Sequence, residues 1–79
     1  MNAEERTQRV IETCLKILES DTLPEHGCAE SLTMLRKIWT VAPLDRMEKA
    51  ALRCVQHADV AVRDAAFLAL QTAVVAQGK

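Results

Sequence analysis

Apolar residues recur at intervals of three and four positions along almost the whole chain, and this spacing is the feature that most limits how it can fold. The first such stripe comprises Val10, Ile11, Cys14, Leu15 and Leu18, with charged residues between its members. This interval places side chains on one face of an α-helix, whereas a half-buried strand would need strict alternation. The chain has only two Gly and two Pro, and it is rich in Ala and Leu, which favour helix. We therefore expect a single all-α domain that spans residues 1–79.

Residues that start and stop helices divide the chain into four predicted helices. Thr22-Leu-Pro-Glu25 matches a capping box, Pro43 disfavours helix at the residue before it, and Asp59 is a favourable N-cap. The predicted helices cover about residues 3–19, 22–41, 44–58 and 60–77. The last two are joined by a turn of only two or three residues, which requires an antiparallel hairpin. The predicted architecture is a four-helix antiparallel arrangement of two α-hairpins.

The predicted helix over residues 60–77 differs from the others because it is apolar on nearly every side. Its few polar positions include Arg63, Asp64, Gln71 and Thr72, and a row of alanines gives it a flat face that another helix could approach closely. A helix of this kind is either central in its domain or half covered by a partner. We expect it to be the central helix and also to contribute to a homodimer interface.

The C-terminal hairpin resembles a known family of helical repeats. Asp59-Val-Ala-Val-Arg63-Asp-Ala-Ala-Phe-Leu-Ala-Leu70 is similar to the second helix of a HEAT-type repeat, with Asp at the turn, Val-Arg one helical turn later, and then small residues and Ala-Leu. Pro43 suits the start of the first helix of such a repeat, so the resemblance covers residues 43–77. It implies an α-hairpin that serves as a protein-binding scaffold, with Asp59 and Arg63 in structural contacts between hairpins.

Two aromatic side chains are candidates for an interface. Aromatic residues, and Trp above all, are enriched among residues that dominate binding energy. Trp39 lies on the apolar stripe of the second helix and is either a core residue or an interface anchor. Phe67 falls on the more polar side of the fourth helix, with Gln71 and Val74 beside it, and is the stronger candidate.

A line of basic residues gives a second candidate surface. Arg46, Lys49 and Arg53 lie on the outer face of the third predicted helix, and Arg63 follows on the fourth. They could contact phosphates or an acidic partner, since phosphate contacts need only Lys and Arg. The fourth helix offers almost no polar side chains to read base edges, so the sequence gives nucleic acid little support as a partner.

The sequence offers weak signals for metal binding and catalysis. His26, Cys28, Cys54 and His57 supply zinc-ligand types, but their spacing is not that of usual zinc motifs, and each cysteine also fits an apolar stripe. No cysteine or serine is paired with a base in a recognisable motif, and no glycine-rich phosphate loop is present. We expect no enzyme activity, no cofactor and no bound metal. Three unpaired cysteines and the absence of a leader peptide or membrane span favour a reducing, cytoplasmic location.

The sequence as a whole favours a non-enzymatic protein–protein interaction module, either a small adaptor or a stoichiometric inhibitor of a larger complex. Its partner would be a protein, and the chain itself is expected to form a homodimer. One alternative is a nucleic-acid-associated regulator that uses the basic helix face. Another is an inhibitor from a phage or mobile element, such as an anti-CRISPR protein, with which only the small size and lack of catalytic motifs agree.

Overall fold

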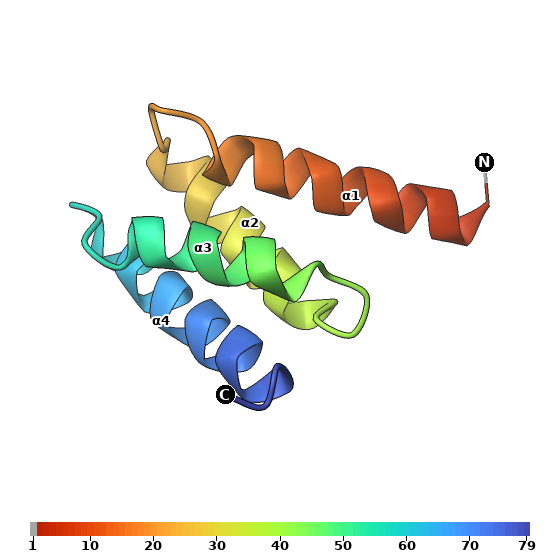
Figure 1. Cartoon of the computed structure of the whole chain (residues 1–79). Helices are drawn as coiled ribbons and strands as arrows, with labels where there is room; N and C mark the ends of the chain where they lie inside the picture. The colour runs from red at the N-terminus through yellow and green to blue at the C-terminus, as the bar shows by residue number, and fades with distance from the viewer. Residues whose placement is uncertain (1) are drawn as a thin grey trace.

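The computed structural model describes residues 2–79 and contains four helices (Figure 1). They are α1 (Ala3–Leu18), α2 (Glu25–Lys37), α3 (Leu44–Cys54) and α4 (Val60–Ala76). Helices are the only regular secondary structure among the described residues, so the predicted all-α class is confirmed. Within residues 2–79, none of them has the length and apolar content that crossing a membrane requires.

The helices form two stacked α-hairpins, as predicted. α1 packs against α2, α3 packs against α4, and the hairpins meet through contacts of α2 with α4 and of α1 with α3. α1 and α3 run in one direction, and α2 and α4 run in the other (Figure 1). The molecule measures 37 × 28 × 17 Å, and its shortest dimension fits a slab two helices thick.

The prediction that the fourth helix is central is wrong. α4 contacts α2 and α3 but not α1, whereas α2 contacts all three of the other helices. α4 therefore lies at one end of the stack and α1 at the other (Figure 1). One side of α4 is left without a neighbouring helix, although its sequence is apolar on that side as well.

The core is built from one buried stripe of each helix. On α4 this stripe consists mainly of small residues, which bring its backbone close to α2 and α3. The largest fully buried side chains are aliphatic or sulfur-containing: Ile11, Leu15, Leu18, Leu32, Leu35, Met47, Val62, Cys28 and Cys54. Val10 was predicted to be part of the first stripe, but its side chain is 39% exposed because it lies at the edge of that face.

The capping box predicted at the start of the second helix does not form. α2 begins at Glu25, and its N-cap is Pro24, which has no side-chain acceptor. Leu23 adopts a left-handed backbone conformation with φ of 43°, so Thr22 lies outside the helix, with its hydroxyl 3.5 Å from that of Ser20. The Leu23 carbonyl oxygen is bonded instead to His57 Nε2 at 2.8 Å, a contact across 34 residues that local sequence cannot reveal.

α2 also ends earlier than predicted, at Lys37 instead of Val41. The residues that follow include Ile38, Trp39 and Val41, and β-branched and aromatic residues favour helix weakly. They form a turn in which the Val41 N–H donates to the Ile38 carbonyl at 3.1 Å. The turn takes Trp39 away from the buried stripe of α2 and leaves it 44% exposed, so it is not the core residue that helical spacing indicated.

The connection between α3 and α4 contains the predicted N-cap but is longer than expected. α3 ends at Cys54, so five residues separate it from α4 rather than two or three. The Asp59 carboxylate accepts from the Val62 N–H at 3.1 Å and caps α4. Arg63 folds back onto the same turn and donates to the His57 carbonyl at 2.8 Å and the Ala58 carbonyl at 3.1 Å. Arg63 therefore stabilises the turn within its own hairpin.

Candidate interaction surface

The side of α4 that faces away from α2 and α3 carries a row of large apolar side chains. We define the outer α4 face as Val60, Asp64, Phe67, Leu68, Gln71 and Val75, all of which are exposed. At 100° per residue these positions fall within one third of the helix circumference. The four apolar members are between 45% and 70% exposed, and Asp64 carries the only charge. A connected apolar row of this kind on a small domain is typical of an interaction site.

Trp39 extends this surface from the turn after α2. Its side chain lines a shallow depression of about 310 Å³ together with Gln71, Thr72, Val75 and Ala76. The structure therefore brings two of the predicted interface residues, Trp39 and Gln71, together at the C-terminal end of the outer α4 face. Phe67 lies on the same face one helical turn before Gln71, with 57% of its surface exposed.

Val74, the fourth predicted interface residue, lies outside the outer α4 face. It is half buried and lies beside the outer α4 face, between that face and the buried stripe of the helix. Three other members of the surface, Val60, Leu68 and Val75, were not predicted. Helical spacing contains the signal for them, because they lie opposite the stripe of Val62, Ala66, Ala69 and Ala73, which is the buried one.

The opposite end of the stack, formed by α1, has a different character. The residues of α1 that face solvent are almost all polar or charged, and Val10 is the only large apolar side chain exposed on it. The first two turns of α1 project beyond the rest of the molecule and contribute nothing to the buried core before Ile11 (Figure 1). The α1 end of the stack therefore has a polar surface, and the α4 end has an apolar one.

Most of the predicted basic line is engaged in contacts within the chain. Arg46 Nη1 lies 3.1 Å from Glu12 Oε1, and Arg46 Nη2 lies 2.8 Å from Glu19 Oε1. The Arg46 guanidinium holds the pKa of the Glu19 carboxyl below its ordinary value. Arg53 donates to the carbonyl oxygens of Leu18 and Ser20, at the C-terminal end of α1.

These contacts join α3 to α1 and to the turn that follows α1. With Arg63 bound to the α3–α4 turn, three of the four predicted phosphate-contacting side chains have partners within the domain. Lys49 is exposed and forms no ion pair with any described residue. The arrangement stabilises the packing of α3 on α1 and leaves little of the basic line for an external phosphate.

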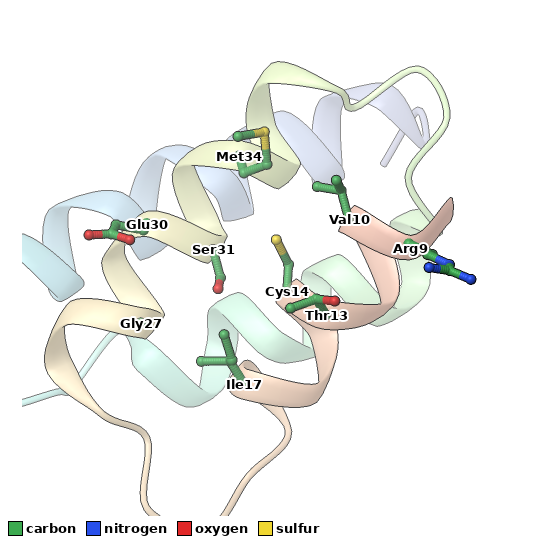
Figure 2. Close-up of a pocket in the computed structure, with 9 residues that line it drawn as sticks. All are labelled: Arg9, Val10, Thr13, Cys14, Ile17, Gly27, Glu30, Ser31 and Met34. Carbon is green, nitrogen blue, oxygen red and sulfur yellow. The ribbon is translucent and has the colours of Figure 1, made fainter. Parts of the chain in front are cut away.

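A second depression, of about 350 Å³, lies between α1 and α2 (Figure 2). The Cys14 thiol and the Ser31 hydroxyl point into it, while the charged ends of Arg9 and Glu30 point away. Ligand sites usually combine an apolar lining with several converging polar groups. This one has a single thiol and a single hydroxyl, and we regard the outer α4 face as the stronger candidate.

Gly27 lies on the floor of the same depression and allows α1 and α2 to approach closely. A Cβ atom at this position would lie 3.0 Å from Ile17 Cγ2. It is the third residue of α2, and it faces Ile17 of α1.

The cysteine and histidine side chains do not assemble a metal site among residues 2–79. No group of three or more His, Cys, Asp or Glu side chains there is arranged to hold a metal ion. Cys28 and Cys54 do meet in the core, but the His57 ring is occupied, with Nε2 on the Leu23 carbonyl and Nδ1 accepting from the Asp59 N–H at 3.0 Å. His26 is exposed on the first turn of α2.

Burial sets the properties of the three thiols. It raises the pKa of Cys28 to about 11, with a further increase from the neighbouring Cys54, and it also raises the pKa values of Cys14 and Cys54. A nucleophilic cysteine needs the opposite change, because the thiolate is the reactive form. All three cysteines therefore have the properties of core residues.

Comparison of the chain with protein-family models, with curated proteins and with solved structures gave no match. The geometry of the surface is therefore the basis for any functional assignment.

Proposed function

We propose that this chain is a non-enzymatic protein–protein interaction module, a small adaptor or stoichiometric inhibitor, and that it binds through the outer α4 face. The observation that carries the proposal is the row of Val60, Phe67, Leu68 and Val75 on a helix side that no other part of residues 2–79 covers. Burying such a row against another protein removes apolar surface from water, which is the main source of association energy.

Three further observations support a binding role. Five of the nine large apolar side chains that are exposed lie on the outer α4 face or, as Trp39, beside it, whereas α1 exposes only Val10. The pKa values of all three thiols are raised, which disfavours cysteine chemistry. Most of the basic side chains that a nucleic-acid regulator would use are bound to acidic or carbonyl groups of the chain, so that alternative has less support.

Phe67→Ala tests the proposal. An aromatic side chain buries about 150–250 Å² in an interface, so the 57% of Phe67 that is exposed offers about 100 Å² to a partner. At about 25 cal/mol per Å², its loss would cost about 2.5 kcal/mol, or about sixtyfold in the dissociation constant. The fold should lose less, because the larger part of the side chain contributes nothing to the core.

Leu52→Ala is the matched control, since Leu52 is 52% exposed on α3 and lies outside the outer α4 face. Each variant would be used to retain proteins from an extract of its native cells, and its own mass would be measured by light scattering over a roughly hundredfold concentration range. We expect association, with another protein or with itself, to survive in Leu52→Ala and to weaken in Phe67→Ala. Identical behaviour of both variants and the wild type would overturn the proposal.

A further inference from the structure

The order of residues on the outer α4 face is symmetric about its centre. Phe67 and Leu68 lie at the midpoint, Asp64 and Gln71 lie three positions outward on either side, and Val60 and Val75 lie four positions further out. The types match as well as the spacing, with apolar residues at the centre and at both ends and one polar residue in each half. This pattern is unrelated to the contacts of α4 within the domain, because these side chains face away from α2 and α3.

Building on the proposed function, we infer that the occupant of the outer α4 face is a second copy of this chain, with the two α4 helices antiparallel about a twofold axis between Phe67 and Leu68. Each symmetric pair lies at equal heights above and below the midpoint, and at equal angles on either side of the midline of the face. A twofold axis that is perpendicular to the helix and passes beside this midpoint therefore places each residue at the same level as the other member of its pair in the second copy.

The resulting contacts are chemically matched along the whole helix. Val60 meets Val75 of the second copy, and the same contact recurs by symmetry at the other end. At the centre, Phe67 and Leu68 lie on opposite edges of the face beside the axis, so each meets its own counterpart in the second copy. Asp64 meets Gln71 of the second copy, whose amide can donate to the carboxylate, so the only charge on the face gains a hydrogen bond in each half. A parallel pairing would instead place each Asp64 against its own symmetry mate, where like charges repel.

The depression beside Trp39 fits the same arrangement. It lies at the C-terminal end of the face, on the side of Thr72 and Ala76. The twofold axis brings the first turn of α4 of the second copy to this end, and the exposed Ala61 of that turn lies on the side of the depression and of Trp39. The exposed indole then becomes part of the interface and completes its apolar surface.

The alternative of head-to-tail stacking is disfavoured by the two ends of the molecule. An α4 face that packed on α1 of the next copy would cover the charged outer side of α1 with valine, leucine and phenylalanine. Such stacking would also leave one apolar face exposed at the end of every filament. Twofold pairing covers both apolar faces and gives a closed dimer. The contact involves one helix per copy, so we expect a small interface and a weak, concentration-dependent dimer.

Substitutions at Gln71 test the register, because antiparallel and parallel pairing give opposite results. In the antiparallel dimer, Gln71→Lys faces Asp64 of the second copy and should tighten association, whereas Gln71→Glu should weaken it. Two exposed charge pairs per dimer correspond to a change of about two- to thirtyfold in the dissociation constant, measured by sedimentation equilibrium at low salt. A parallel dimer would be weakened by both substitutions, which would overturn the register.

Disulfide trapping gives an independent readout of the same geometry. Val60→Cys and Val75→Cys chains, when mixed and mildly oxidised, should cross-link to each other and not to themselves. Self-linked Val60→Cys would refute the antiparallel register. A wild type that stays monomeric throughout would refute self-pairing altogether. If that monomer still retains a cellular protein that Phe67→Ala loses, the proposed function survives and only the identity of the partner changes.

Discussion

Arg53→Met should destabilise the domain more than any other substitution of an exposed basic residue. The guanidinium donates to the carbonyl oxygens of Leu18 and Ser20, which lie at the end of α1 where helix carbonyls lack partners. It also places a positive charge at the negative end of the helix dipole. Met keeps the apolar stem of the side chain and removes only the charged head.

The two hydrogen bonds set the size of the expected effect. A hydrogen bond from a charged group contributes about 1.5–3 kcal/mol when well shielded, but one of these two lies at an exposed site, so we expect about 2 kcal/mol in total. For a domain of this size that corresponds to a decrease of roughly 8–16 °C in Tm. Arg53→Lys retains the positive charge but not the planar guanidinium that donates both hydrogen bonds. It should recover about half of the lost stability.

Thermal unfolding followed by circular dichroism measures the difference. Lys49→Met is the matched control, because Lys49 lies on the same helix and forms no ion pair with a described residue. The control should change stability by less than about 0.5 kcal/mol. If Arg53→Met and Lys49→Met melt at the same temperature, the contacts to the end of α1 contribute nothing and the reasoning is refuted.

Three further predictions concern the core, the thiols and the response to acid. Ala69→Leu should lower the free energy of unfolding by about 1–3 kcal/mol, because Ala69 is fully buried against neighbouring helices. Ala61→Leu, on the exposed side of the same helix, should change it little. Equal denaturant midpoints for the two variants would contradict this prediction. Native Cys28, whose pKa is about 11, should react with a thiol reagent at pH 8 about a hundredfold more slowly than in the unfolded chain, and similar rates would show that it is not buried. The pKa of Glu19 is lowered by Arg46, so this contact stabilises the fold above the ordinary glutamate pKa of about 4.3 and is lost as the pH falls through the lower folded-state value. Tm should therefore fall more steeply between about pH 7 and pH 3 in wild type than in Arg46→Met, and parallel profiles would argue against the coupling.

Local sequence was sufficient to predict the four helices and most of the core. The apolar spacing of α1 and α3 follows directly from the periodicity of a helix, and the Asp59 cap depends only on a residue three positions away. Both features are local, so they can be read without knowledge of the fold. The antiparallel pairing of the last two helices followed from the short connection between them.

The errors arose where a distant residue decides the local conformation. The capping box at Thr22 fits its sequence, but the Leu23 carbonyl bonds to His57 and the loop turns away from the helix. The basic line on α3 looked free because its partners lie on α1 and on the turn that follows it, 27 to 35 residues earlier in the chain. No spacing rule within α3 could show that Arg46 and Arg53 bind there.

The candidate interaction surface was only partly predictable because α4 is apolar on nearly every side. Phe67 and Gln71 were identified since they stand near polar neighbours, but Val60, Leu68 and Val75 could equally have been core residues. The choice between the two sides depends on which one α2 and α3 cover, and they cover the side with small residues. Tertiary packing therefore leaves the larger apolar side chains exposed.

This distribution of small and large residues on α4 supports a surface that is built for contact. If α4 served only to close the core, polar residues on its outer side would cost the fold nothing and would improve solubility, as they do on α1. The chain instead places small residues inside, where α2 and α3 approach closely, and large ones outside, where no part of the described domain reaches them. Large apolar side chains contribute most when they are fully covered, so their position at the end of the stack is what the proposed partner-binding role would require.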